Sequence, residues 1–225
     1  MGAMFASQTV ENYLKTIYLA QTELASAKEL VPMGQLASAL GVVPGTATTM
    51  VKTLAESGLV RYEPYIGVRL TNSGEKLASL VLRRHRLIEL FLVKVLGMSW
   101  ADVHDEAEQL EHAVSERLID RIDEMLGRPD VDPHGDPIPT AQGKIARLDH
   151  PDLTTAPIGV PLVVARILDQ DASFLRFVEQ RGLVPGEPVR IESRDASADA
   201  VALDAAGTRT TIGARAASKV LVRRA

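Results

Sequence analysis

The sequence contains no cysteine, which excludes disulfides, thiolate zinc sites, iron–sulfur clusters and cysteine nucleophiles. Aromatic residues make up only 4% of the chain, so the core is expected to be aliphatic. The N-terminus lacks the basic region and apolar stretch of a signal peptide. No uncharged apolar run approaches the about 20 residues that a membrane-spanning helix needs. We therefore expect a cytoplasmic, globular protein.

Charge is distributed unevenly along the chain. Of the 225 residues, 46% are hydrophobic and 24% are charged, which is ordinary for one large domain or two small ones. The formal net charge is −4, but residues 1–100 carry a net charge of +3 and residues 101–225 one of −7. This asymmetry is typical of a nucleic-acid-binding protein in which only the first half meets phosphate.

Residues 8–71 have the pattern of three helices followed by a β-hairpin. The first two helices show apolar residues at helical spacing, and Pro44 suits the first turn of a third helix that ends near Gly58. Two short β-prone runs on either side of residues 63–67 predict the hairpin. Helix, tight turn, helix and β-wing together form a DNA-docking unit, whose second helix of the pair enters the major groove.

The third helix, residues 44–57, turns several hydroxyls and one lysine outward. Threonine is a mediocre helix former, so several on one exposed face favour DNA contact over the alternative of a small helical domain with an ordinary polar surface. The side chains that suit base edges and phosphates are Thr46, Thr48, Thr49, Thr53 and Lys52. On the hairpin, the candidates for holding the DNA backbone are Arg61, Tyr62, Tyr65 and Arg69.

The remainder of the chain changes character twice. Residues 72–126 predict two long helices, the first opened by a capping box at Asn72 and Glu75 and the second running from about Ala101 to Met125. Residues 127–158 are rich in proline, glycine and aspartate and predict an ordered or semi-ordered linker. A small β-barrel is predicted next, from strands at 162–167, 189–193, 200–203 and 219–223 and a helical piece near 174–180.

Histidines and glutamates gather on the two long helices. His85 and Glu89 are four residues apart and share a helix face. The next helix carries four more candidates within an arc of roughly 100°, namely His104, Glu108, Glu111 and His112. Imidazoles and carboxylates that project from facing helices are how helical bundles build metal sites. For each residue alone, a solvated helix charge is the alternative.

The candidate ligands are all nitrogen and oxygen donors. Such a set suits the hardness of Mn2+ or Fe2+. In the general affinity order of divalent first-row metals, however, Zn2+ and Cu2+ bind at least as tightly. His134 and His150 have no companions at helical spacing, and we interpret both as surface residues.

Four stretches of the chain resemble the DtxR/MntR family of metal-dependent repressors. They are Thr-Val-Glu-Asn-Tyr-Leu-Lys-Thr-Ile-Tyr (9–18), Arg-His-Arg-Leu-Ile-Glu-Leu-Phe-Leu (84–92), Val-His-Asp-Glu-Ala-Glu-Gln-Leu-Glu-His (103–112) and His-Gly-Asp-Pro-Ile-Pro (134–139). The resemblance covers essentially the whole chain and implies a mainly α fold. Its expected parts are a winged helix-turn-helix DNA-binding domain at 1–72, a metal-binding and dimerisation domain at 73–140, a linker at 141–158 and an SH3-like (FeoA-like) β-barrel at 159–225.

The resemblance also implies two neighbouring metal sites. One would use His85, Glu89 and His104. The other would use Glu108, Glu111, His112 and a residue of the first helix that falls at Asn12, where relatives resemble one another in placing Met or Asp. The neutral carbonyl oxygen of Asn12 implies a weaker or differently tuned link between the metal and that helix.

Two further features bear on the metal. Iron-type members have a cysteine where Glu108 stands, so this residue indicates the manganese-type branch. Some relatives lend a Glu and a Gln from the barrel to the first site, and the corresponding region here matches only loosely, at Asp169, Gln170 or Asp171.

The function that the resemblance implies is repression of metal-ion transport and homeostasis genes. A homodimer would bind a pseudo-palindromic DNA operator when Mn2+ is bound, with Fe2+ as the alternative effector and other divalent transition metals binding in vitro. No enzyme activity, membrane partner or organic cofactor is expected. The rival hypotheses are a metal-independent winged-helix regulator, a metalloenzyme, and an adaptor role for the barrel. The metalloenzyme lacks support from any nucleophile motif, phosphate loop or dinucleotide fingerprint.

Overall fold

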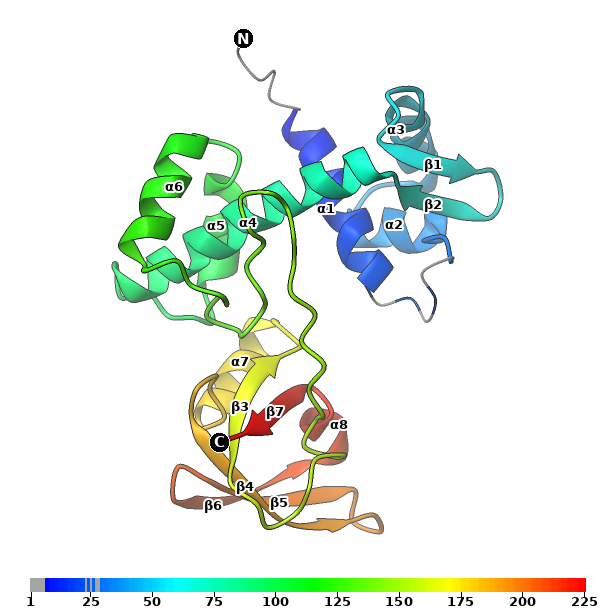
Figure 1. Cartoon of the computed structure of the whole chain (residues 1–225). Helices are drawn as coiled ribbons and strands as arrows, with labels where there is room; N and C mark the ends of the chain where they lie inside the picture. Colours follow the sequence, from blue (N-terminus) through cyan, green and yellow to red (C-terminus); the bar gives the residue numbers. More distant parts are fainter. Residues whose placement is uncertain (1–6, 23, 25, 27–28) are drawn as a thin grey trace. The chain divides into compact units, whose positions relative to one another are not determined.

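The computed structural model describes residues 7–22, 24, 26 and 29–225, and these residues form two compact units (Figure 1). The first, called here the N-terminal unit, comprises Met1–Arg84 and Pro139–Ile145. The second, the C-terminal unit, comprises His85–Ile138 and Ala146–Ala225.

The N-terminal unit is a winged helix-turn-helix, as expected. Its elements, in chain order, are α1 (Gln8–Thr22), α2 (Met33–Ala39), α3 (Pro44–Glu56), β1 (Val60–Glu63) and β2 (Gly67–Leu70). Pro44 opens α3, where its missing N–H has no intrahelical partner to lose. The aliphatic core that joins these elements includes Leu14, Ile17, Leu36, Val51 and Leu54, all fully or almost fully buried.

The wing is a two-stranded antiparallel hairpin. Val60 lies opposite Leu70, and Glu63 lies opposite Gly67. The tip carries Tyr65, which is fully exposed and has a φ of 68°, in the left-handed region that few non-glycine residues adopt. The hairpin therefore presents an aromatic side chain to solvent at its end.

Helix α4 (Asn72–Lys94) is the longest helix among the described residues. Its cap lies one residue before the predicted capping box, because Thr71 Oγ1 accepts a hydrogen bond from Gly74 N at 3.2 Å. The sequence prediction of one further helix from Ala101 to Met125 is wrong. The chain instead forms α5 (Val103–Leu110) and α6 (Glu116–Met125). Ser115 ends the break between them, because its side chain accepts a hydrogen bond from Leu118 N and caps α6.

The last part of the chain is a five-stranded antiparallel sheet with the strand order β6-β5-β4-β3-β7. Its strands are β3 (Leu162–Ile167), β4 (Pro188–Asp195), β5 (Ala200–Ala205), β6 (Thr208–Gly213) and β7 (Val220–Arg224), with α7 (Ala172–Glu179) after β3 and α8 (Ala214–Ala217) before β7. The sequence reading found four of these strands and missed β6. Trp100 and Ala101 pack into the core of this sheet, so the turn before α5 belongs to the same hydrophobic cluster.

Residues 127–158 are not simply a linker, because the middle of this stretch is packed inside the protein. From residue 132 to residue 139 every residue is buried except Pro133, which is half-buried. Two arginines of α4 bind its backbone: Arg86 Nη1 donates to Pro137 O at 2.6 Å, and Arg83 Nη1 donates to Pro139 O at 3.1 Å. The buried guanidinium groups thus supply hydrogen-bond donors to backbone carbonyls that would otherwise be buried without a partner.

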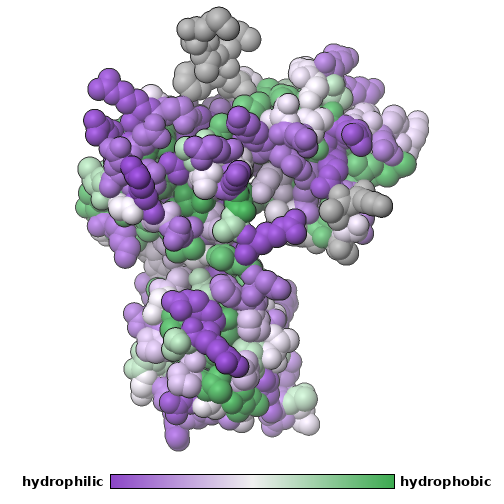
Figure 2. All heavy atoms as spheres, viewed as in Figure 1, coloured by the Kyte–Doolittle hydropathy of each residue, from purple (hydrophilic) through white to green (hydrophobic). Residues whose placement is uncertain are grey.

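The surface is mixed in polarity. On the face shown in Figure 2, apolar side chains appear as separate patches among polar ones. Within the part of the chain that the structure describes, no helix is long and apolar enough to cross a membrane.

A pair of glycine substitutions tests the packing between α4 and the wing. A Cβ on Gly74 would lie 2.0 Å from Leu59 O, whereas a Cβ on Gly45, also in the first turn of a helix, would meet nothing within 4 Å. We expect Gly74→Ala to lower the free energy of unfolding by about 1–3 kcal/mol through overpacking. Gly45→Ala should leave it unchanged or raise it by up to about 1 kcal/mol. Urea denaturation followed by circular dichroism measures both, and equal effects would contradict the close approach at Gly74.

Candidate metal centre and nucleic-acid interface

The histidines and glutamates predicted as ligands come together in the C-terminal unit. His85 and Glu89 lie one turn apart on α4, and the remaining four follow from His104 to His112 on and just after α5. Glu89 and Glu111 are 1% and 0% exposed, so these carboxylates are removed from water. A carboxylate in such a position requires hydrogen bonds or a cation as partners.

His85 joins two of these carboxylates. Its Nδ1 lies 2.6 Å from Glu111 Oε2, and its Nε2 lies 3.0 Å from Glu89 Oε1. Both ring nitrogens therefore face carboxylate oxygens, and each can donate only if the imidazole carries both protons.

The same pattern continues on either side of His85. His104 Nδ1 lies 3.4 Å from Glu89 Oε1, and His104 Nε2 lies 3.8 Å from Glu108 Oε1. His112 Nε2 lies 3.3 Å from Glu111 Oε1. The two ligand sets expected from the sequence are thus parts of one network of alternating imidazoles and carboxylates.

His134 is a residue that the sequence reading placed wrongly. It is 0% exposed, not a surface residue. Its Nε2 lies 2.9 Å from Trp100 O, so this nitrogen donates a hydrogen bond to the carbonyl. Nδ1 is buried without a hydrogen-bond partner and lies 3.8 Å from Glu89 Oε2 and 4.0 Å from Asp132 Oδ1.

Asp132 is the second residue that sequence reasoning missed. It is buried, and its Oδ2 accepts no hydrogen bond, with Arg86 Nε at 3.5 Å as a neighbouring cation. The signal available in the sequence was the Asp-x-His spacing of 132 and 134 at the start of the His-Gly-Asp-Pro-Ile-Pro stretch. His150, the other histidine interpreted as a surface residue, is half-buried.

Three groups of side chains could each hold a metal ion, because their ligand atoms all lie within 4.8 Å of one another. The groups are His85, His104 and Glu108; Glu89, Asp132 and His134; and Glu108, Glu111 and His112. Glu108 belongs to two of the groups. The donor atoms are imidazole nitrogens and carboxylate oxygens throughout, which fits a first-row divalent cation of the manganese or iron type.

The electrostatics of the two most buried acids differ. Burial raises the pKa of Glu89, but the charge of His85, the hydrogen bonds from His104 and His85 and the charge of His134 outweigh it and hold that pKa well below its usual range. Burial raises the pKa of Asp132 well above its usual value, and the charges of Asp136 and Glu89 raise it further, while Arg86 offsets only part of this. Asp132 therefore sits where additional positive charge would be stabilising.

Asn12, the first-helix candidate, lies on α1 in the N-terminal unit. It is half-buried, and its Oδ1 is a buried atom without a hydrogen-bond partner. An unpaired carbonyl oxygen of this kind is a suitable ligand atom. Its participation in the second metal site stays a prediction.

The three barrel residues considered as extra ligands are each engaged elsewhere. Asp169 Oδ2 pairs with Lys219 Nζ at 2.5 Å. Gln170 Nε2 donates to Asp136 Oδ2 at 2.6 Å, and Asp171 caps α7 by accepting from Ser173 N. None of the three belongs to a candidate metal group among the described residues.

The expected DNA-contacting face of α3 is accessible. Thr46, Thr49 and Lys52 are exposed and Thr48 is half-buried. The hydroxyls of Thr48 and Thr49 donate to Pro44 O and Gly45 O in their own helix, which leaves their oxygen lone pairs to accept from a partner.

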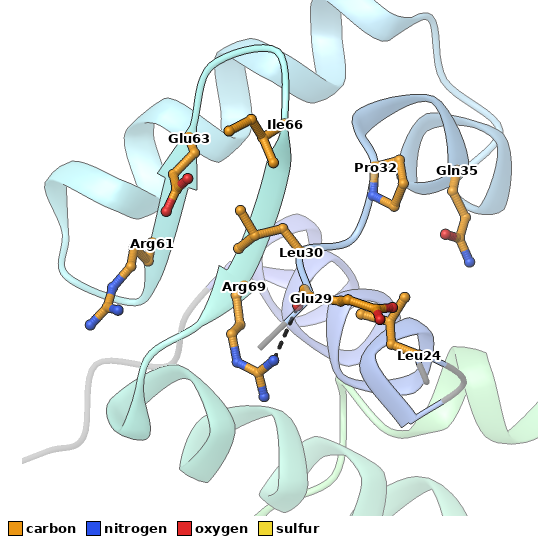
Figure 3. Close-up of a pocket in the computed structure, with 9 residues that line it drawn as sticks. All are labelled: Leu24, Glu29, Leu30, Pro32, Gln35, Arg61, Glu63, Ile66 and Arg69. Atoms are coloured by element: carbon orange, nitrogen blue, oxygen red, sulfur yellow. Dashed lines mark hydrogen bonds between the residues drawn. The ribbon is translucent and has the colours of Figure 1, made fainter. Parts of the chain in front are cut away.

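The wing arginines have different surroundings. Figure 3 shows Arg61 on β1 and Arg69 on β2 beside a hollow that Leu30 and Ile66 also line. Arg69 Nη1 donates to Glu29 O at 3.1 Å and so anchors β2 to the segment before α2. Arg61 is exposed, and it remains the better candidate of the two for a DNA phosphate.

Three family models match the chain in succession. They are described as "Iron dependent repressor, N-terminal DNA binding domain" over residues 6–68, "Iron dependent repressor, metal binding and dimerisation domain" over 71–140, and "FeoA domain" over 152–224. The iron-dependent repressor IdeR of Mycobacterium leprae is 32% identical over 206 residues, which are 84% of this chain and 85% of that protein. This chain belongs to the DtxR/MntR family of metal-dependent transcriptional repressors. Members of the DtxR/MntR family are DNA-binding proteins and not enzymes, so the metalloenzyme hypothesis is set aside.

Other relatives point to both metals that the sequence left open. The regulator MntR of Lysinibacillus sphaericus is 35% identical over 118 residues, covering 52% of this chain and 81% of that protein. A solved structure described as a manganese-dependent transcriptional repressor in complex with manganese is 39% identical, with a TM-score of 0.83, and covers 96% of this chain and 100% of that one. The IdeR of T. acidophilum is 26% identical, with a TM-score of 0.73, and covers 100% of both chains.

A second glycine pair tests how the His134 loop is held. A Cβ on Gly135 (φ +86°) would lie 2.0 Å from Ala165 O, whereas one on Gly97 (φ +67°) would meet nothing within 4 Å. Gly97→Ala should therefore cost only the roughly 1–2 kcal/mol of a left-handed non-glycine residue. Gly135→Ala should cost about 1–3 kcal/mol more, because the loop must move away from β3. Urea unfolding of the two variants gives the comparison, and equal losses would show that the contact with β3 does not constrain the loop.

Proposed function

We propose that this protein is a Mn2+-responsive repressor of metal-transport and homeostasis genes that acts in the cytoplasm, where its DNA operator lies. The observation that carries the proposal is the buried imidazole–carboxylate network on α4 and α5, next in the chain to a winged helix-turn-helix. All candidate metal ligands of the network are oxygen or nitrogen atoms. The family to which the chain belongs consists of metal-dependent repressors. Fe2+ is the alternative effector, because iron-dependent relatives match nearly the whole chain.

The proposed ligands form two neighbouring sites. His85, Glu89 and His104 serve the first, with Asp132 and His134 added because their ligand atoms lie close to Glu89. The second uses Glu108, Glu111, His112 and Asn12. A bound cation would supply positive charge between these closely spaced carboxylates.

The chain's own residues explain how such a centre would control DNA binding. His85 and Glu89 are rigidly spaced on α4, the helix that begins immediately after the wing. If Asn12 of α1 completes the second site, binding of the metal is coupled to the orientation of the DNA-binding helices. Raising the population of the DNA-binding conformation from about 1% to about 99% would need metal to bind it about 10^4-fold more tightly than the other conformation.

The operator is proposed to be pseudo-palindromic. A homodimer with two-fold symmetry presents two α3 helices and so matches two half-sites separated by about one helical turn or a multiple of it. The apolar side chains left exposed on α5 and α6 are candidates for the dimer interface: Leu110, Leu118 and Met125.

The deciding experiment measures binding to the DNA upstream of the chain's own gene and of neighbouring metal-transport genes. It is titrated with Mn2+, Fe2+ and Zn2+ and reversed with EDTA. We expect Glu108→Ala to abolish metal-dependent binding, with a loss at least as large as the about 10–100-fold that follows removal of an outer-shell partner. Glu106→Ala, an exposed glutamate of the same helix outside the candidate groups, is the control and should bind as the wild type does.

The outcomes separate the hypotheses. Binding by the wild-type chain that ignores both metal and EDTA would leave a metal-independent winged-helix regulator. Retained Mn2+ dependence in Glu108→Ala would show that the second site is misassigned.

Lys52 on α3 provides a separate test of the DNA interface. Lys52→Ala should weaken binding to all duplexes and reduce the slope of log K against log salt by about one, because one phosphate contact and its released counterion are lost. Arg209→Ala removes an exposed cation from the C-terminal sheet and should leave the slope unchanged. Fluorescence anisotropy at several salt concentrations measures both variants, and an unchanged slope for Lys52→Ala would argue against the phosphate contact.

A further inference from the structure

The loop that carries Asp132 and His134 is closed by its own aspartate. Asp132 Oδ1 accepts hydrogen bonds from His134 N at 2.8 Å and from Asp136 N at 3.0 Å. These bonds set the backbone of residues 132–136 but attach it to nothing else. A second set of contacts is therefore needed to hold the loop in place.

Asp136 supplies that attachment. It is 3% exposed, and its carboxylate receives three groups from two other parts of the chain. Gln170 Nε2 donates to its Oδ2 at 2.6 Å, Arg166 of β3 forms an ion pair with its Oδ1, and Arg86 Nη2 of α4 lies 3.5 Å from the same Oδ1. The backbone adds one more bond, from Ile167 N to His134 O at 2.8 Å.

Two arginines accompany the acids of this cluster. Arg86 lies 3.5 Å from a carboxylate oxygen of both Asp132 and Asp136, and Arg166 faces Asp136. A buried pair of this kind is favourable only with good geometry and further hydrogen bonds, and Gln170 and Pro137 O supply such bonds here. The cluster ties β3 to the loop with a specific geometry.

We propose that Arg166 and Gln170 are positioning residues for the metal centre, acting through Asp136 on the loop that presents His134 and Asp132. The C-terminal sheet then tunes the centre through Asp136. The inference rests on the proposed function, because it needs Glu89, Asp132 and His134 to bind the cation. Outer-shell partners of this kind orient ligands and change metal affinity by about 10–100-fold.

The test measures Mn2+ affinity of the full-length chain by isothermal titration calorimetry, with bound ion counted by electron paramagnetic resonance. Arg166→Gln should weaken Mn2+ binding by about tenfold or more. Gln170→Ala, which changes no charge, should weaken it severalfold, and Arg166→Lys should restore part of the loss. Arg209→Gln, which breaks an exposed ion pair with Glu192 on the same sheet, is the matched control and should bind as the wild type does.

For the Arg166→Gln variant, the loss of a positive charge and the loss of a positioning contact predict opposite changes in Mn2+ affinity. Removing a nearby positive charge alone would tighten binding of a cation, so tighter binding by Arg166→Gln would overturn the proposal. A purely structural role would lower the urea midpoint of the variants but leave the Mn2+ affinity of the folded protein unchanged, and that result would overturn it as well.

His134→Ala separates this inference from the proposed function. If His134→Ala loses Mn2+ affinity while Arg166→Gln and Gln170→Ala bind as the wild type does, the positioning role is wrong and the metal centre stands. If His134→Ala binds Mn2+ as the wild type does, the loop holds no metal and the positioning role falls with it. In that case the proposed function is tested by the DNA binding of the Glu108→Ala variant alone.

Discussion

Glu89 is a carboxylate that water barely reaches, and the chain surrounds it with the imidazoles of His85, His104 and His134. These rings come from α4, from α5 and from the loop before β3, so three segments distant in sequence converge on one negative charge. Their combined charge and hydrogen bonds keep the pKa of Glu89 low despite burial. A cation bound here would interact with the same carboxylate that the three imidazoles now face.

Helix α4 gives two units of the protein a common element. Arg84, on its N-terminal side, forms a buried ion pair with Glu11 of α1 at 2.7 Å, while the next residue, His85, enters the metal network. Successive side chains on a helix point about 100° apart, so the adjacent residues Arg84 and His85 can contact different partners. Breaking a buried pair such as Arg84–Glu11 by removing one partner costs about 3–5 kcal/mol, so this pair is a strong attachment of α1 to α4.

Local spacing predicted the winged helix-turn-helix, the start of α4 to within one residue and the His85–Glu89 pairing, because each depends on residues close in sequence. It failed at the break after Leu110, since the apolar residues keep their helical phase across it and only the cap at Ser115 marks the new start. It also failed at His134, whose partner Glu89 is remote in sequence and whose loop has no period to detect. The place of a loop residue depends on tertiary contacts, here with Trp100 O and β3, which no window of sequence contains.

The scarcity of aromatic residues has a practical consequence at the metal centre. Trp100 is the sole tryptophan of the chain, it is 7% exposed, and its indole lies 5.6 Å from the imidazole of His134, measured between ring centroids. Its backbone oxygen also holds the His134 Nε2 proton. Indole emission from this protein thus arises at a single buried point beside the loop. The local order of this loop can be followed optically in the unlabelled chain, without a dye or a probe substitution.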